Sequence, residues 1–252
     1  MKYAIELDRV TKTYKDKTAV SDLTLRLEQG SVVALLGPND AGKSTTVNMM
    51  LGLLQPTSGS VRLLGRSPQE AAVRARIGAM LQEVSVIDGL KVGETIELFR
   101  SYYPKPLGTE QLLAISGLTE ERSKFASALS GGQKRRLGFA LALAGDPEVI
   151  FLDEPTVGMD ITSRQLFWQT IRSFAGGNRT IVLTTHYLEE ADGIADRVAV
   201  IAKGQLVADG TLDEIKTSAG LQYVSFTAGA DVAKETLLAL PGVRTRVGAD
   251  AG

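Results

Sequence analysis

The stretch Gly37-Pro38-Asn39-Asp40-Ala41-Gly42-Lys43-Ser44-Thr45 decides how the rest of this chain is expected to fold. It follows the apolar run 32–36, which has the composition of a buried strand, and precedes residues 46–51, which are typical of a helix. In that context the pattern G-x-x-x-x-G-K-[ST] forms a loop whose backbone N–H groups surround phosphate, aided by the positive end of the helix dipole. Lys43 is expected to reach the β- and γ-phosphates, and the Ser44 hydroxyl to ligate Mg²⁺. The stretch therefore predicts a nucleotide site rather than an ordinary surface loop.

The composition indicates a globular protein and excludes several kinds of site. The 252 residues are 44% hydrophobic and 23% charged, which suits one large domain plus an appendage. The formal net charge of −1 gives no electrostatic reason to expect a nucleic-acid partner. The absence of cysteine excludes disulfides and thiol chemistry, and a single histidine excludes a His-rich metal site. No apolar run approaches the ~20 residues that cross a bilayer, and no signal-peptide pattern opens the chain, so we expect a cytosolic protein that reaches a membrane through a partner.

The order of periodic segments predicts an α/β core with a helical insertion. Residues 3–10 and 23–27 alternate with period two and indicate half-exposed strands. Tyr14 lies between these two strands, where a tyrosine is usually a packing residue. From 84 to 144 the period is helical, which predicts an all-helical lobe inserted into the core.

Polar side chains follow three apolar strands of the expected core. Asp153 and Glu154 end the run 149–152, and acids are costly in a buried strand unless they face a ligand. Asp153 is suited to holding Mg²⁺ and Glu154 to orienting an attacking water, although a solvent-exposed acid pair is the alternative. Gln82 and His186 also stand at strand ends, where doubly wound folds place ligand contacts. A lone histidine is more often a surface or satisfied core residue, but this position favours function.

Two helix starts carry further candidates. Ser130, Gly131, Gly132 and Gln133 open a helix whose free N–H groups and hydroxyl form an anion-binding surface. A serine-capped helix with a glycine hinge is the commoner interpretation of such a pattern. Asp160 precedes a second amphipathic helix and is a natural N-cap, which alone would explain it.

Together these motifs resemble the ATP-binding subunit of ABC transporters, over roughly residues 1–217. The resemblance implies that Tyr14 stacks on adenine and that Gly37 to Thr45 hold the phosphates. It identifies Gln82 as the glutamine of the Q-loop, a group for catalysis and for the metal. Residues 129–133 match the family's signature motif.

The resemblance also assigns the strand-end acids and the histidine. Asp153 matches the acid of the magnesium site, together with Ser44, and Glu154 matches the catalytic carboxylate. Asp160 ends the D-loop, and His186 is the switch histidine. The cofactors implied are ATP and Mg²⁺.

The architecture implied is a P-loop NTPase core with a parallel sheet, an antiparallel β subdomain at the N-terminus and the inserted helical lobe. Two such subunits form a head-to-tail dimer, in which the residues Ser130 to Gln133 of one copy cover the ATP of the other. ATP hydrolysis then drives a separate membrane permease, which places the subunit on the cytoplasmic face of the membrane. The run 184–192 resembles exporters of drugs, lipids or polysaccharides, so export is expected.

Three features depart from the family pattern. Asp40 stands where glycine is usual, and its charge is expected to weaken nucleotide binding without abolishing it. The D-loop has the sequence Val157-Gly158-Met159-Asp160 instead of serine-glycine-leucine-aspartate. Residues 218–252 are not part of the shared core and are expected to form a small C-terminal α/β tail with the order strand, helix, strand, in an incomplete form.

A soluble ABC-type ATPase that acts on DNA or ribosomes is the competing interpretation. DNA-repair members separate the P-loop and the signature by long coiled coils, and ribosome-acting members carry two ATPase domains in tandem. This chain has neither feature, and its net charge is −1, so the transport subunit is favoured.

Overall fold

The computed structural model describes residues 2–82, 86–175 and 179–218. Contacts divide the chain into two units, Met1–Ile215 and Lys216–Gly252. The strand–helix–strand tail expected after residue 218 lies outside the described residues. Among the described residues, no helix combines the length and the apolar character needed to cross a membrane.

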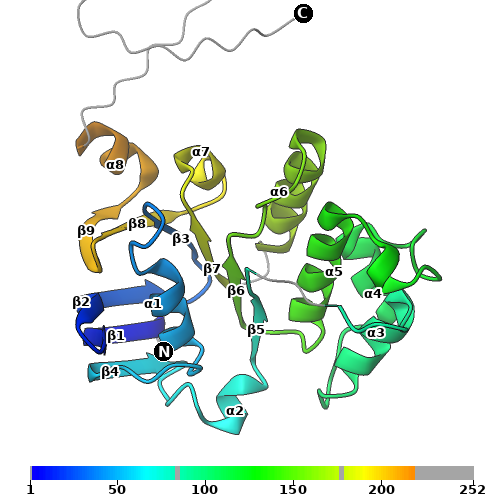
Figure 1. Cartoon of the computed structure of the whole chain (residues 1–252), viewed down its shortest axis with the longest axis horizontal. Helices are drawn as coiled ribbons and strands as arrows, with labels where there is room; N and C mark the ends of the chain where they lie inside the picture. The colour runs from blue at the N-terminus through cyan, green and yellow to red at the C-terminus, as the bar shows by residue number, and fades with distance from the viewer. Residues whose placement is uncertain (1, 83–85, 176–178, 219–252) are drawn as a thin grey trace, which may run out of the picture. The chain divides into compact units, whose positions relative to one another are not determined.

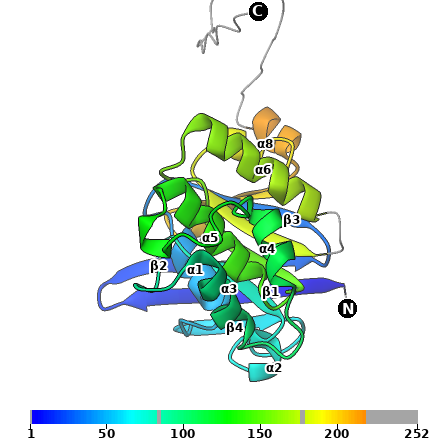
Figure 2. The same cartoon turned by 90° about the vertical axis from the view of Figure 1, so that its right-hand side faces the viewer.

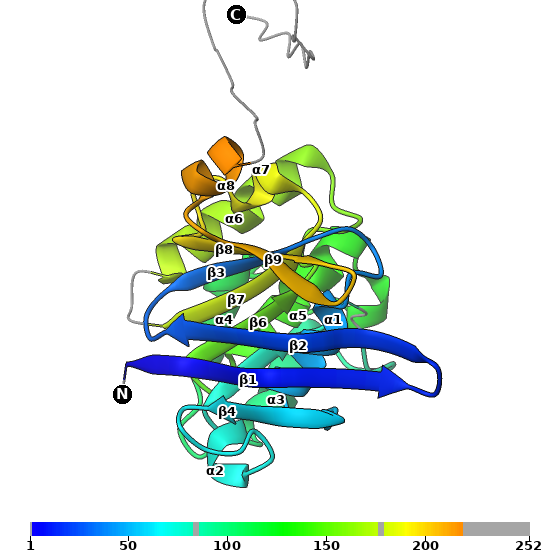
Figure 3. The ribbon, with the colours of Figure 1, turned by 90° about the vertical axis from the view of Figure 1, so that its left-hand side faces the viewer.

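A small antiparallel sheet forms the N-terminal part of the first unit (Figure 3). Its strands, in the order β2-β1-β4, are β2 (Lys17–Glu28), β1 (Tyr3–Tyr14) and β4 (Ser58–Leu63). Strands β1 and β2 are longer than the predicted 3–10 and 23–27, and Tyr14 pairs with Lys17 at the end of the hairpin. The extension was missed by sequence periodicity because, apart from the buried Val20, its side chains are exposed or only partly buried and show no regular apolar face.

The large sheet carries the parallel strands predicted for the core (Figure 1). Its strands, in spatial order, are β5 (Ile77–Met80), β6 (Val149–Asp153), β7 (Thr180–Thr185), β3 (Val32–Leu36), β8 (Arg197–Ala202) and β9 (Gln205–Gly210). All neighbours pair in parallel except β8 and β9, which form an antiparallel hairpin. The carboxyl ends of β3, β6 and β7 therefore meet at one edge of the sheet.

Helices cover both faces of this sheet. They are α1 (Lys43–Met50), α2 (Ala71–Arg74), α3 (Val92–Arg100), α4 (Thr109–Ser116), α5 (Gly131–Leu143), α6 (Ile161–Ala175), α7 (Leu188–Ala191) and α8 (Leu212–Ser218), with a 3₁₀ turn at Ala126–Ala128. Successive residues of a strand enter opposite cores: Val33 packs in the core that contains α1 and the small sheet, and Ala34 in the core that contains α5 and α6. Burial on both faces explains why β6 reads as an unbroken apolar run.

The segment between β5 and β6 is the helical lobe expected from the sequence (Figure 2). In its described part the regular structure is helical, and a single isolated bridge joins Lys91 to Phe125. Helix α5 begins with a reciprocal cap, in which the Ser130 hydroxyl accepts the Gln133 N–H at 3.3 Å and the Gln133 side chain accepts the Ser130 N–H at 2.9 Å. Ser130 is thus the N-cap of α5, as in the serine-capped helix considered from the sequence.

Gly78 tests the packing of β5 against α5. A Cβ at this position would lie 1.9 Å from the carbonyl oxygen of Ala142 in α5, so the strand and the helix would have to separate. We expect Gly78→Ala to destabilise the protein by about 1–3 kcal/mol, as overpacking does. In Gly108→Ala the nearest atom would lie 3.9 Å away, so this control should unfold near the wild-type urea midpoint. Equal midpoints for both variants would contradict the packing described.

Candidate nucleotide-binding site

The loop 37–45 joins β3 to α1 and needs glycine at two positions. Gly42 has a φ of +99°, and a Cβ there would lie 2.5 Å from the carbonyl oxygen of Ala19. A Cβ on Gly37 would lie 2.1 Å from the carbonyl oxygen of Ile201. Gly42 is also the N-cap of α1 and offers no capping side chain, so N–H groups at the start of this helix remain available to an anion.

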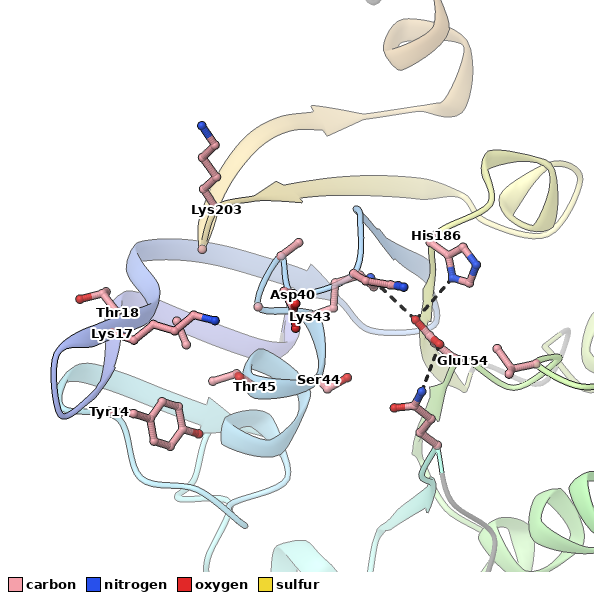
Figure 4. Close-up of a pocket in the computed structure, with 17 residues that line it drawn as sticks. Tyr14, Lys17, Thr18, Asp40, Lys43, Ser44, Thr45, Glu154, His186 and Lys203 are labelled. Atoms are coloured by element: carbon pink, nitrogen blue, oxygen red, sulfur yellow. Dashed lines mark hydrogen bonds and ion pairs between the residues drawn. The ribbon is translucent and has the colours of Figure 1, made fainter.

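A cavity of about 900 Å³ opens above this loop (Figure 4). Of the predicted site residues, those that line it are Tyr14, Asn39, Asp40, Ala41, Gly42, Lys43, Ser44, Thr45, Gln82, Glu154 and His186. The structure thus brings together candidates from five separate parts of the chain. Tyr14 is 47% exposed at the end of the β1–β2 hairpin, where its ring is available for stacking on a base.

The cavity has further walls that sequence reasoning did not identify. They are formed by Lys17, Thr18, Ala19, Val157, Lys203 and Gly204. Backbone hydrogen bonds place the β8–β9 turn against the loop and the hairpin, from the Gly204 N–H to the Ala41 carbonyl (2.9 Å) and from the Ser21 N–H to the Gly204 carbonyl (2.8 Å). In the sequence, Gly204 could have indicated this wall of the cavity, because glycine is typical of tight turns with positive φ, and its φ here is +77°.

Lys43 is buried, and its ammonium is turned toward its own loop. It donates to the carbonyls of Gly37 at 2.7 Å and Pro38 at 3.0 Å, and lies 3.8 Å from Glu154 Oε1. Burial lowers the pKa of Lys43, while the charges of Glu154, Asp153 and Asp40 oppose that shift. A phosphate would therefore replace contacts that Lys43 makes within the protein.

Glu154 lies at the centre of the polar groups in the cavity. Its Oε1 is 3.5 Å from His186 Nδ1, and its Oε2 accepts a long hydrogen bond of 3.4 Å from Gln82 Nε2. The side chain is 12% exposed. The carboxylate thus contacts a lysine, a histidine and an amide, all of them at 3.4 Å or more.

Asp153 and Ser44 form a pair of oxygen donors beside Glu154. The Ser44 hydroxyl donates to Asp153 Oδ1 at 3.3 Å, and the Thr184 hydroxyl donates to the same oxygen at 2.5 Å. Hard oxygen donors of this kind suit Mg²⁺, which needs few protein ligands when phosphate supplies others. The Ser44 and Asp153 side chains therefore fit the ion that the sequence predicted, and Gln82 lines the same cavity.

The remaining predicted residues do not line this cavity in the described part of the chain. Gly37 and Pro38 contribute the carbonyls that hold Lys43. Ser130 to Gln133 lie at the start of α5 in the helical lobe, where a Cβ on Gly131 would meet no described atom within 4 Å. Asp160 caps α6 by accepting the N–H (2.8 Å) and the hydroxyl (2.7 Å) of Ser163, and these bonds lower the pKa of Asp160.

Family models match two parts of the chain. The model described as ABC transporter matches residues 20–157. A second model, described as AAA domain, putative AbiEii toxin, Type IV TA system, matches residues 124–192.

Two curated relatives of the chain are ATP-binding proteins, one of drug resistance and one of Nod factor export. The chain is 40% identical over 252 residues to the daunorubicin resistance ATP-binding protein DrrA3 of Streptomyces coeruleorubidus, covering 95% of this chain and 79% of that protein. It is 40% identical over 214 residues to the Nod factor export ATP-binding protein I of Paraburkholderia xenovorans, covering 82% of this chain and 70% of that protein.

Among solved structures, a bacterial ABC transporter cassette in its dimeric form matches with a TM-score of 0.75 at 27% identity, covering 82% of this chain and 98% of that one. The post-hydrolysis dimer of that cassette, bound to ADP and Pi, matches with the same TM-score at 26% identity and the same coverage. These neighbours share the P-loop NTPase fold that the sequence predicted.

Asp40 is a site residue whose charge can be tested directly. It is exposed and has a φ of +61°, the left-handed conformation expected at a position where glycine is usual. Its carboxylate adds negative charge beside the phosphate loop, so Asp40→Gly should tighten ATP-Mg²⁺ binding by roughly tenfold, or ~1–2 kcal/mol. The gain should shrink at high ionic strength, because salt screens exposed charges.

Titration calorimetry of ATP-Mg²⁺ at low and high salt measures this effect. Asp22→Gly is the matched control, since Asp22 is also an exposed aspartate with positive φ (+49°) but lies outside the residues that line the cavity. Its affinity should equal that of the wild type. Equal affinities of Asp40→Gly and the wild type at low salt would show that the Asp40 charge does not reach the nucleotide.

Proposed function

The chain belongs to the ABC transporter family and is an ATP-binding subunit that hydrolyses ATP, and we propose that Glu154 orients the attacking water in this reaction. The observation that carries the proposal is the position of Glu154 at the end of β6. There it lines the cavity above the phosphate loop and faces Lys43, His186 and Gln82 (Figure 4). A carboxylate in this position suits general-base chemistry.

The phosphate loop and Lys43 bind the β- and γ-phosphates in this proposal. Backbone N–H groups at the start of α1 supply fixed donors, and Lys43 exchanges its loop carbonyls for phosphate oxygens. Ser44 and Asp153 hold Mg²⁺, with Gln82 as a further oxygen donor. When bound, Mg²⁺ neutralises charge on the transferring phosphoryl group.

The departure of Lys43 from Glu154 frees the carboxylate for water. Their atoms lie 3.8 Å apart, and a phosphate that draws Lys43 away removes this ion-pair partner. His186 Nδ1 lies 3.5 Å from the same oxygen. In this proposal the His186 side chain contacts the γ-phosphate. Binding and water activation are thus coupled through one buried lysine.

A second copy of the chain completes the site in this proposal. The signature residues Ser130 to Gln133 lie in the helical lobe, away from the cavity of their own chain. In a head-to-tail dimer, the start of α5 of one copy covers the nucleotide of the other, with its Ser130 hydroxyl and N–H groups facing phosphate. The dimeric cassette with the same fold supports this arrangement.

In this proposal, the free energy of ATP hydrolysis drives a separate membrane permease, and the direction of transport is export. The two curated relatives act in drug resistance and in Nod factor export, which supports this direction. The subunit then sits on the cytoplasmic face of the membrane through the permease. The proposed contact is formed by the exposed apolar side chains Leu81, Ile87 and Phe125, at the junction of β5 with the lobe and within the lobe. The largely apolar sequence 84–87 belongs to the same proposed contact, and its residues 84 and 85 lie outside the described residues.

Glu154→Gln tests the assignment of the catalytic carboxylate. The amide keeps the shape of the side chain but cannot take a proton, so ATP should still bind while hydrolysis falls by about 10²–10⁴-fold. The variant should also accumulate as an ATP-bound dimer, measured by size-exclusion chromatography, because the dimer can no longer hydrolyse its ATP and dissociate. Near-normal phosphate release by purified Glu154→Gln would rule out this role.

A single cysteine at Ile87 tests the permease contact. The native chain contains no cysteine, so Ile87→Cys provides one reactive site, and its position is 43% exposed. Crosslinking in membranes that hold a co-expressed permease should join the two proteins. The control is Val207→Cys, at a position that is 58% exposed. It belongs to β9, a strand on the opposite side of Figure 1 from the helical lobe. Crosslinking from position 207 but not from 87 would refute the proposed contact.

A further inference from the structure

Glu190 is a buried acid that the proposed chemistry does not use. It lies in the short helix α7, directly after the loop that carries His186, and is 7% exposed. Glutamate is seldom buried unless its charge is paired and its oxygens accept hydrogen bonds. From sequence this residue suited the start of a helix by its charge alone, which does not explain its burial.

Both oxygens of Glu190 accept a threonine hydroxyl. The Thr156 hydroxyl donates to Oε1, and the Thr185 hydroxyl donates to Oε2 at 2.6 Å. Arg164 of α6 supplies the opposite charge, with its Nε 3.8 Å from Oε1. Thr185 extends the chain of bonds, since its hydroxyl oxygen accepts the Tyr187 N–H at 3.0 Å.

These partners are the neighbours of the proposed catalytic groups. Thr185 immediately precedes His186. Its hydroxyl is bonded to Glu190 and to the N–H of Tyr187, the residue that follows the histidine. Thr156 follows Glu154 by two positions and begins the turn of the D-loop, where its carbonyl accepts the Met159 N–H at 3.1 Å. One carboxylate is therefore bonded to the segment after Glu154 and to the segment that holds His186.

The bridge lies where backbone pairing ends. The ladder between β6 and β7 reaches its last pair at Asp153 and Thr184. Beyond that pair strand pairing ends, and side-chain bonds link the two segments. The Thr184 hydroxyl provides one such bond at the ladder's end, by accepting the Glu154 N–H at 2.9 Å, and Glu190 joins the segments further out.

We propose that Glu190 is a positioning residue that joins the D-loop to the segment that holds His186. It thereby fixes the distance between the side chains of His186 and Glu154. This inference rests on the proposed roles of Glu154 and His186. Because Glu190 is bonded to Thr156, the distance between His186 and Glu154 also depends on the position of the D-loop. The D-loop continues through Asp160 into α6. A shift of about 1 Å in a catalytic group can reduce a rate by roughly 10²-fold, so a bridge of this kind affects turnover more than binding.

The chemistry of the bridge predicts an order among substitutions. Alanine removes both acceptors, and the hydroxyls of Thr156 and Thr185 lose their shared partner. Glutamine keeps the shape and one acceptor oxygen, while its amide can donate to the other hydroxyl, since a hydroxyl both donates and accepts. Glu190→Gln should therefore retain more activity than Glu190→Ala, which a role of charge alone would not produce.

Steady-state ATP hydrolysis by the full chain measures the effect. Glu190→Ala should lower kcat by roughly 10–100-fold with KM for ATP within about threefold, because the phosphate loop is untouched. Glu190→Gln should lower kcat by less than tenfold. The matched control is Glu189→Gln, which removes the same charge from the adjacent exposed position and should keep wild-type kcat.

A double-mutant cycle separates positioning from a general loss of stability. Thr156→Val and Thr185→Val each remove one hydroxyl at constant shape, and each should lower kcat in the wild-type background. In the Glu190→Ala background the same changes should add little, because the bonds are already lost. Additive losses in both cycles would overturn the bridge, and the two valine variants decide the question if Glu190→Ala does not fold.

The outcomes distinguish this inference from the proposed function. If Glu154→Gln is inactive while Glu190→Ala keeps wild-type kcat, the bridge is wrong and the catalytic assignment stands. If Glu154→Gln is active, the catalytic assignment itself fails. A loss in Glu190→Ala that appears in KM with kcat unchanged would also overturn the inference, since it would place Glu190 in nucleotide binding.

Discussion

The burial of one ammonium group governs the nucleotide site. Lys43 is 5% exposed, and an isolated charge at that depth would be costly. The protein meets this cost with the carbonyls of Gly37 and Pro38 and with the nearby carboxylate of Glu154. Phosphate oxygens can replace the carbonyl partners of Lys43, and the Glu154 carboxylate then loses its ion-pair partner. The loop is therefore stabilised by its own lysine until a ligand displaces it.

The acids that face Lys43 are possible because of where the strand ends. Strand β6 is buried along its whole length, so a charge inside it would have no partner. At its last position Asp153 meets hydroxyl donors, and at the next Glu154 leaves the sheet with a φ of +45°. Thr184 of the neighbouring strand serves both, because its hydroxyl donates to Asp153 and accepts the Glu154 N–H. A β-branched threonine suits the strand and supplies this polar contact as well.

The parts of the site that sequence predicted are those in which one local pattern carries the information. The loop 37–45, the acids after β6 and the histidine after β7 each follow an apolar strand, and parallel pairing brings those strand ends together. Lys17 and Lys203 were missed because turns bring them to the cavity from distant parts of the chain, and nothing near them in sequence indicates phosphate. The local sequence of Glu190 indicates only an acid near a helix start, because its buried partner Thr156 lies more than thirty positions away.

The two glutamates of this region show how one residue type serves opposite purposes. The contacts of the Glu154 carboxylate are at 3.4 Å or more, whereas its backbone N–H is fixed to Thr184 at 2.9 Å. Its backbone position is therefore defined while its carboxylate stays free to exchange partners, which suits the role in water activation that we propose for it. Glu190 has the reverse arrangement, because its carboxylate is held by two short hydroxyl bonds inside the protein. A buried carboxylate with a hydroxyl partner on each oxygen is suited to fixing its neighbours rather than to reacting. In our proposal, the freedom of the Glu154 carboxylate depends on Glu190, which holds the surrounding loops in place.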